Sequence, residues 1–396
     1  MFAVLKVPKY VLPLIVLAQF CCTSLWFAGN GVMTELTQDF GLGRDALGHL
    51  TSAVQFGFIT GTLTFAILTI ADRFPPSRVF LLSAIAGACF NLGLIGSFNQ
   101  LCSLLAFRFL TGFFLAGIYP VGMKIASDYY REGLGKSLGY LVGALVVGTA
   151  FPHLFRGLTD LLPWKYILTG ISTLAIVGGL LMALFVPDGP YRQPGSSLKL
   201  SAFIKVFGNP GLRSAAVGYF GHMWELYAFW AFVPVMLATY KSLHPEALIN
   251  IPLWSFAIIG IGGISCVVGG YLSLNFGAKK VALIALTLSG VCCLLSPLFF
   301  LIDLSWLFIT FLLFWGMVVI ADSPLFSTLV AKNARSEHRG TALTIVNCIG
   351  FALTIVSIQL INLLWNTINP TYIYVILGLG PALGLISLKV NRKSDS

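Results

Sequence analysis

Charged side chains are scarce in this chain of 396 residues: Asp, Glu, Lys and Arg together make up 10% of it. Soluble domains carry roughly 25% charged residues, so the composition excludes an ordinary soluble protein. Only 14 residues are acidic against 24 Lys and Arg, which gives a net charge of +10. The basic residues fall in short clusters between apolar runs, which indicates loops of a membrane protein and argues against a nucleic-acid partner.

Two kinds of motif are also missing. The sequence has no Cys-x-x-Cys pair, and its eight cysteines all lie within apolar runs, so we predict small packing residues, with no metal and no cofactor. It also has no Gly-x-x-x-x-Gly-Lys-Ser/Thr loop, which argues against transport driven by ATP.

Long apolar runs are abundant, and hydrophobic residues make up 57% of the chain. A membrane-spanning helix needs about 20 apolar residues, and we count twelve such windows. The first has a basic flank like a signal peptide but is too long for one, so we interpret it as a retained span. The windows are 10–33, 47–70, 79–98, 101–127, 138–159, 164–186, 213–238, 250–274, 280–301, 305–329, 341–364 and 371–389.

The basic residues predict the orientation of these spans. Alternate loops, counted from the N-terminus, carry 18 Lys and Arg, whereas the other loops carry only Arg44, Lys165 and Lys241. Cytoplasmic loops are the basic ones, so both termini are expected in the cytoplasm. We therefore expect a multi-pass protein of a bacterial inner (cytoplasmic) membrane, in contact with the lipid bilayer.

The connection near the middle divides the chain into six spans and six spans. Residues 1–187 are expected to form an N-terminal six-helix bundle, 188–212 a cytoplasmic linker, and 213–396 a C-terminal six-helix bundle. Pro, Gly and Ser open the linker, and apolar residues at helical spacing from Leu198 to Phe207 predict a short amphipathic helix on the membrane surface. Equal halves suggest an internal duplication.

Short motifs lie in equivalent loops of the two halves. The loop after span 2 reads Ala71-Asp72-Arg73, followed by Arg78. The loop after span 8 has Leu274 in place of the Asp but keeps Gly270, Gly277, Lys279 and Lys280. Span 4 adds Arg108 followed by Gly112, Gly117 and Pro120. These motifs resemble those of the major facilitator superfamily of secondary transporters, although Leu68 and Pro75-Pro76 depart from that family's usual glycines and basic residues.

The resemblance implies an all-α membrane protein of twelve transmembrane helices, arranged in two six-helix bundles with pseudo-two-fold symmetry. It implies a transporter, not an enzyme, that works by alternating access on a small-molecule substrate, and we expect a monomer. Asp72 would form a cytoplasmic gate with Arg73, Arg78 or a helix N-terminus; the alternative is a solvated turn. Span 5 is glycine-rich but lacks the glycine spacing of the family's drug antiporters, and close helix packing also explains its glycines.

Several ionisable residues lie inside the predicted spans, where each is costly and suggests function. Arg108 cannot lose its charge and suits an anionic substrate or a structural carboxylate partner. Arg156 could join His153 in a basic patch at the outer mouth, or extend to the interface like Lys124. Asp322 precedes Pro324, so a bend is expected there; its carboxylate is either functional or a local cap.

Glu225 and His222 open the second half. They are three residues apart and share a helical face, where together they could take up and release a proton. The alternative is a buried hydrogen-bonded pair, and a metal site lacks a third ligand. Arg108 and Asp322 are the expected partners of Glu225.

The resemblance places a central cavity between spans 1, 4, 7 and 10, which we expect to bind substrate and proton. Beside the ionisable residues it would be lined by Trp26, Asn30, Tyr119, Trp224, Tyr227 and, from span 11, Asn347.

We therefore predict a secondary transporter of a small organic solute, with an organic anion favoured by Arg108, His153 and Arg156, and with coupling to protons. The alternatives are a proton-coupled exporter of drugs or metabolites and a membrane-embedded enzyme. Five scattered histidines disfavour the enzyme.

Overall fold

The computed structural model describes residues 8–130, 134–159, 162–192, 207–335, 338–365 and 367–390, and over these residues it is all-helical without strands. Within these described ranges, ten helices are long and apolar enough to cross a membrane. Two shorter apolar helices, Val11–Thr23 and Ile373–Lys389, occupy the first and last predicted windows. The all-α membrane fold class is confirmed. The amphipathic helix expected up to Phe207 lies outside the described residues, except for Phe207 itself.

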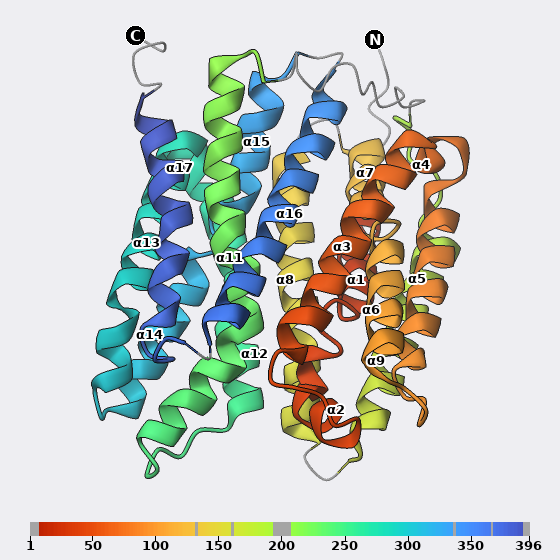
Figure 1. The fold of residues 1–396 in the computed structure, drawn as a ribbon. Helices are drawn as coiled ribbons and strands as arrows, with labels where there is room; N and C mark the ends of the chain where they lie inside the picture. The colour runs from red at the N-terminus through yellow and green to blue at the C-terminus, as the bar shows by residue number, and fades with distance from the viewer. Residues whose placement is uncertain are drawn as a thin grey trace.

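The helices form two groups, one from each half of the chain (Figure 1). Helix α1 begins and α17 ends on the same face, which we call the terminal face; the other is the distal face. The first half contains α1 (Val11–Thr23), η1 (Asn30–Val32), α2 (Met33–Asp39), α3 (Ala46–Ile67), α4 (Ile70–Arg73), α5 (Pro76–Gly93), α6 (Leu101–Leu115), α7 (Tyr119–Tyr129), α8 (Leu134–Leu158) and α9 (Trp164–Phe185). The second contains α11 (Pro210–Leu243), α12 (Ile251–Phe276), α13 (Ala278–Leu301), α14 (Ser305–Val318), α15 (Ser323–Asn333), α16 (Arg339–Leu364), η3 (Ile373–Gly378) and α17 (Leu379–Val390).

Spans 4 and 10 are both broken near their middle. Helix α6 gives way to α7, which carries Pro120 in its first turn, and α14 gives way to α15, which carries Pro324 in its first turn. Proline has no N–H to donate and is tolerated in the first turn of a helix, so each proline starts a new helix. The bend expected at Pro324 is present. The break before Pro120 was not anticipated, although the two prolines lie 204 residues apart at equivalent positions.

The same offset of 204 residues appears in the packing of each half. A Cβ at Gly112 of α6 would overlap the carbonyl oxygen of Val54 on α3, and a Cβ at Gly316 of α14 would overlap that of Ile258 on α12. Glycine therefore permits the same close backbone approach in both halves. These two contacts support an internal duplication.

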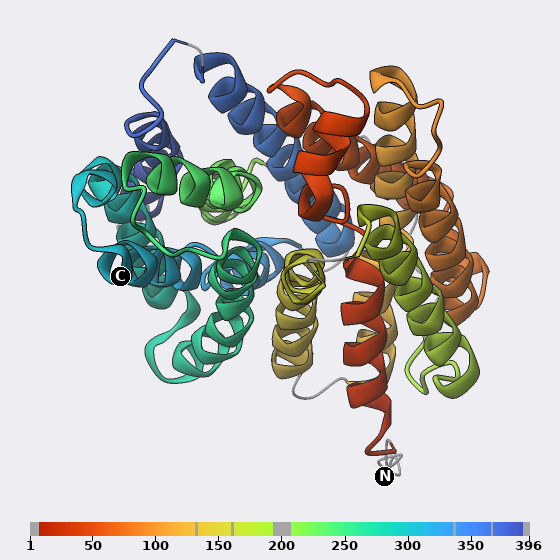
Figure 2. The same cartoon turned by 90° about the horizontal axis from the view of Figure 1, so that it is seen from below.

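Two helix pairs join the halves: α8 lies along α12, and α3 lies along α16 (Figure 2). In the first pair, a Cβ at Gly143 or Gly263 would lie 3.1 Å from the carbonyl oxygen of the other glycine. In the second pair, the Gln359 amide donates a 2.8 Å hydrogen bond to the Ser52 hydroxyl near the distal face. Close helix packing, one of the two explanations considered for the glycines of span 5, therefore accounts for Gly143.

The pairing of α8 with α12 loosens toward the terminal face. A Cβ at Gly139 of α8 or Gly270 of α12 would meet no atom of the described residues within 4 Å. At the distal end of the same pair, a Cβ at Gly157 would crowd Leu253. The α8–α12 contact is therefore crowded at Gly157, near its distal end, and leaves room for a side chain at Gly139 and Gly270 toward the terminal face.

This packing predicts opposite outcomes for two glycines of the second half. Gly316→Ala places a methyl group against the Ile258 carbonyl and should destabilise the protein by about 1–3 kcal/mol, the usual cost of overpacking. Gly270→Ala meets open space in a helix and should be neutral or stabilising by up to about 1 kcal/mol. Thermal unfolding in detergent measures both, and equal effects of the two variants would contradict the packing.

Candidate substrate and proton site

The Arg108 guanidinium of α6 is buried, with 1% of its surface exposed. Its Nη1 donates a hydrogen bond of 3.2 Å to the Leu25 carbonyl, and its Nη2 donates to the Trp26 carbonyl. Its Nε has no hydrogen-bond partner. No carboxylate of the described residues lies within ion-pair distance of Arg108, so this buried cation has hydrogen-bond acceptors but no counter-charge.

A break in span 1 supplies these carbonyl groups. Helix α1 ends at Thr23, and the chain continues in tight turns, with the Trp26 amide donating to the Thr23 carbonyl at 3.0 Å. Carbonyls at a helix end need other donors, and Arg108 provides them. A Cβ at Gly29 would stand 3.4 Å from the Arg108 Nε, so the glycine keeps that edge of the guanidinium uncrowded.

Other buried polar groups surround this break without complete hydrogen bonding. Asn30 donates to the Thr51 hydroxyl at 2.9 Å, but its Oδ1 has no partner. Gln55, one helical turn after Thr51 on α3, has no partner at either amide atom, and His153 of α8 has none at Nε2. Buried polar groups are normally paired, so these unpaired atoms make this part of the first half a candidate binding site.

An aromatic cluster lies beside this site, where the two halves meet. The Trp26 ring lies 4.8 Å from Phe58, 5.7 Å from Tyr227 and 5.7 Å from Phe351, measured between ring centroids. Tyr227 in turn lies 5.1 Å from Trp230. Residues of α3 and the span 1 break thus contact residues of α11 and α16, which joins the halves through aromatic rings.

Other predicted cavity residues divide into two groups. Tyr219 donates a 2.7 Å hydrogen bond to the Asn347 side chain, which links spans 7 and 11, and Tyr119 is half-buried at the start of α7. Trp224 instead donates to the Ile376 carbonyl of η3 at 3.2 Å. It therefore lies against span 12, away from Trp26.

The carboxylate of Glu225 is fully buried inside the second half. It accepts hydrogen bonds from the Trp315 indole at 2.6 Å, the Ser289 hydroxyl at 2.9 Å and the Cys293 thiol at 3.3 Å. In the described part of the chain it makes no hydrogen bond or ion pair with Arg108, Asp322 or His222. Its partners are donors on α13 and α14.

His222 and Asp322 form a buried pair at the break in span 10. The His222 Nδ1 lies 2.8 Å from the Asp322 Oδ1, and each side chain is 1% exposed. The contact does not have the direction of a good hydrogen bond, and Nε2 of His222 and Oδ2 of Asp322 have no partner. No third metal-binding side chain joins them within the described ranges. This imidazole–carboxylate pair is therefore a candidate proton site at the break in span 10.

Near the distal face, the structure neutralises Arg156. Its guanidinium forms a 2.6 Å ion pair with Glu35 and donates to the Leu162 carbonyl at 3.1 Å. The basic patch expected from Arg156 and His153 is therefore balanced by an acidic partner that the sequence did not suggest.

At the terminal face, Asp72 pairs with Lys124 at 2.9 Å. The Lys124 ammonium also lies 3.8 Å from the Asp128 carboxylate. It therefore links two acidic residues of this region, and does not only extend to the membrane interface. Arg73 donates to the Thr69 hydroxyl at 3.1 Å, and Arg78 is exposed. All these groups belong to the first half.

The equivalent loop of the second half joins α12 to α13. Gly277, between α12 and α13, has a φ of +82°, a conformation that favours glycine. The Lys280 ammonium lies 5.7 Å from the centre of the Phe276 ring, and Lys279 follows Gly277 by two residues.

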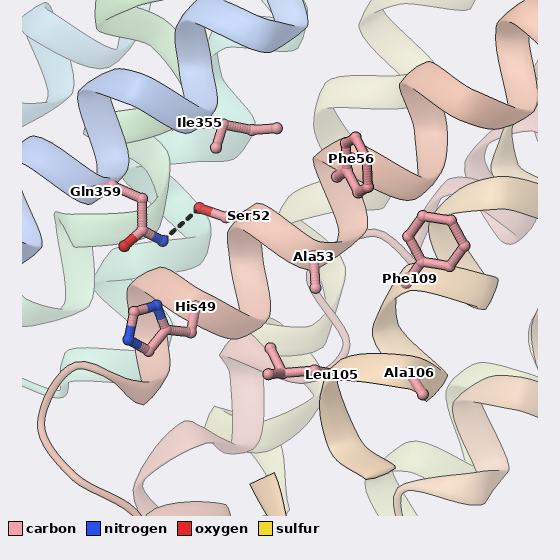
Figure 3. A pocket seen from close by; sticks show the side chains of 9 residues that line it. All are labelled: His49, Ser52, Ala53, Phe56, Leu105, Ala106, Phe109, Ile355 and Gln359. Atoms are coloured by element: carbon pink, nitrogen blue, oxygen red, sulfur yellow. Dashed lines mark hydrogen bonds between the residues drawn. The ribbon is translucent and has the colours of Figure 1, made fainter. Parts of the chain in front are cut away.

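A groove of about 490 Å³ lies between α3, α6 and α16 (Figure 3). The Gln359–Ser52 hydrogen bond lies along it, and Phe56 and Phe109 line it. Its lining is mostly apolar and contains none of the predicted site residues, so it is separate from the polar site at Arg108.

The sequence analysis did not single out several residues that complete these clusters. Nothing in the sequence indicated them, because they come from helices far apart in the chain: Gln55, Phe58, Phe351 and Ser289.

Comparison with known proteins agrees with this architecture. A family model described as Major Facilitator Superfamily matches residues 15–358. The chain is 34% identical to the 4-hydroxybenzoate transporter PcaK of Pseudomonas aeruginosa over 42% of its own length and 35% of that protein's. It is 31% identical to the protein of the same name from Acinetobacter baylyi, over 41% and 35%, and 29% identical to the niacin transporter NiaP of that organism, over 35% and 36%.

These matches span about a third of the length of each curated relative. The family model, in contrast, covers most of the chain, from the middle of α1 to the end of α16. The chain therefore belongs to the Major Facilitator Superfamily of membrane transporters.

Proposed function

We propose that the protein is a secondary transporter of a small organic anion, whose carboxylate binds Arg108. The observation that carries this proposal is a buried guanidinium with two carbonyl acceptors, one unpaired edge and no acidic partner among the described residues. Carbonyl oxygens satisfy hydrogen bonds but leave a full positive charge in a low-dielectric interior, where it costs several kcal/mol. An anionic substrate supplies the missing charge.

The geometry of the free edge suits a carboxylate. Guanidinium and carboxylate groups form two parallel charge-assisted hydrogen bonds, and the Nε of Arg108 is free to supply one of them. The aromatic rings of Trp26, Phe58 and Phe351 pack together at the residue whose carbonyl accepts from Arg108, and they offer an apolar surface. A ring that carries a carboxylate fits both features.

The names of the relatives point the same way. 4-Hydroxybenzoate and niacin each combine an aromatic ring with a carboxyl group. We infer that the substrate of this chain belongs to the same chemical class of aromatic or similar organic acids.

Transport proceeds by alternating access in this proposal. The α8–α12 contact is crowded near its distal end and leaves room toward the terminal face. The terminal face is cytoplasmic by the distribution of Lys and Arg, in a bacterial inner membrane, so this arrangement is inward-facing. Rocking about the α8–α12 and α3–α16 contacts would open the distal side.

Proton coupling is assigned to His222 and Asp322. Their unpaired atoms, together with their place at the break of span 10, allow a change in protonation to alter how α15 packs against α11. Glu225 has three donors that hold it in place, which suits a structural role within the second half.

Removing the guanidinium should abolish recognition of the carboxylate. Arg108→Gln is expected to weaken binding of 4-hydroxybenzoate by about 30-fold or more, since charge-assisted hydrogen bonds contribute about 1.5–3 kcal/mol each. Arg108→Lys should keep only part of the wild-type affinity, because an ammonium group lacks the planar, two-pronged geometry of a guanidinium. Isothermal titration of purified protein measures these affinities.

Two controls belong to this experiment. Lys165→Gln removes a positive charge from an exposed position and should bind like the wild type. 4-Hydroxybenzamide, which lacks the charge, should not bind the wild type measurably. Undiminished binding of the acid by Arg108→Gln would refute the assignment.

The proton assignment predicts a selective loss in proteoliposomes. With an imposed pH gradient, the wild type should accumulate substrate, while Asp322→Asn should lose gradient-driven accumulation yet retain exchange of labelled for unlabelled substrate. Glu225→Gln, which keeps the size of the side chain, should still accumulate substrate. Wild-type uptake that does not depend on the pH gradient would refute proton coupling. Normal accumulation by Asp322→Asn would show that Asp322 does not carry the proton.

A further inference from the structure

Two tryptophans at equivalent positions of the halves have indole N–H groups without a hydrogen-bond partner. Trp26 and Trp230 are 1% and 0% exposed, and the Nε1 atom of each is unpaired. The other two buried tryptophans are paired: Trp164 donates to Asp39 at 2.7 Å and Trp315 to Glu225 at 2.6 Å. A buried indole usually finds an acceptor, so this pair is exceptional.

The two indoles converge on one place. Trp230 follows Trp26 by 204 residues, the offset that relates Pro120 to Pro324. The Tyr227 ring lies 5.7 Å from Trp26 and 5.1 Å from Trp230, so both indoles contact the same ring. That ring lies where the halves meet, beside the break whose carbonyls hold Arg108.

We propose that Trp26 and Trp230 form a polar subsite that binds a second hydrogen-bond acceptor of the substrate, at the end of the ring opposite the carboxylate. The inference rests on the proposed function, since Arg108 fixes the acid at one end. It adds a requirement on the substrate: an apolar ring acid does not fill the subsite, whereas a ring acid with a hydroxyl, carbonyl or ring-nitrogen acceptor does.

The arrangement has a physical reason. Two buried donors are costly to leave unpaired, and a substrate acceptor removes that cost on binding. Sites with buried donors reject analogues that lack the matching group more strongly than apolar pockets reject a change in size. One tryptophan comes from each half, so an acceptor held by both would bind most tightly when the halves are closed around it.

The test compares two acids of nearly equal shape. Wild-type protein should bind 4-hydroxybenzoate at least about 10-fold more tightly than 4-methylbenzoate, measured by isothermal titration. Trp26→Phe and Trp230→Phe keep an aromatic ring but remove the N–H, and each should reduce that ratio to about 3-fold or less, mainly by weakening binding of the hydroxy acid. Trp306→Phe, at an exposed position, should leave the ratio unchanged.

The outcomes separate this inference from the proposed function. If both acids bind the wild type equally, the subsite is refuted while the carboxylate site stands. If Phe variants lose both acids equally, the tryptophans only pack, and the subsite is again refuted. If neither acid binds the wild type and Arg108→Gln changes nothing, the proposed function fails. Should a Phe variant not fold, the wild-type ratio alone decides.

Discussion

The structure depends on how a permanent positive charge is accommodated inside a membrane protein. Arg108 cannot be neutralised by losing a proton, so the protein must surround it with acceptors or counter-charge. It does so with main-chain carbonyls at the break in span 1, which ends helix α1 at Thr23. The break supplies the carbonyls that accept from the guanidinium, and Gly29 leaves room for its Nε edge.

The internal duplication repeats the scaffold but not the charges. Gly112 and Gly316, Pro120 and Pro324, and Trp26 and Trp230 occupy equivalent positions. The equivalent of Arg108, however, is Leu312, while the equivalents of His222, Glu225 and Asp322 are Ala18, Cys21 and Ile118. The first half therefore carries the buried guanidinium, and the second carries Glu225 and the pair of His222 with Asp322. This asymmetry suits a transporter that handles an anion in one half and a proton in the other.

Sequence patterns predict which segments span the membrane and which of them are equivalent, because hydrophobic length and loop charge are local properties. They do not predict partners, because contacts depend on how helices rotate against each other. His222 and Glu225 are three residues apart on α11, yet one contacts Asp322 on α15 while the other is held by Ser289, Cys293 and Trp315. Residues three apart point about 60° away from each other around the helix axis. This difference in direction gives His222 a partner that makes it a candidate proton carrier, and gives Glu225 partners that suit a structural carboxylate.

The same limit applies to Arg108 and Lys124. The sequence placed both inside a predicted span but could not reveal that one meets carbonyl groups and the other the Asp72 carboxylate. The break at residues 24–29 could not be predicted from the sequence either, since that stretch contains no proline. These partners depend on the distances between helices, and the sequence of one segment does not determine those distances.

A structure of the protein with a bound aromatic acid would test the central claim most directly. The account predicts density for the carboxylate against the free Nε edge of Arg108, with the ring among Trp26, Tyr227 and Phe351. Density for the acid elsewhere, with Arg108 still bound only to the Leu25 and Trp26 carbonyls, would contradict it.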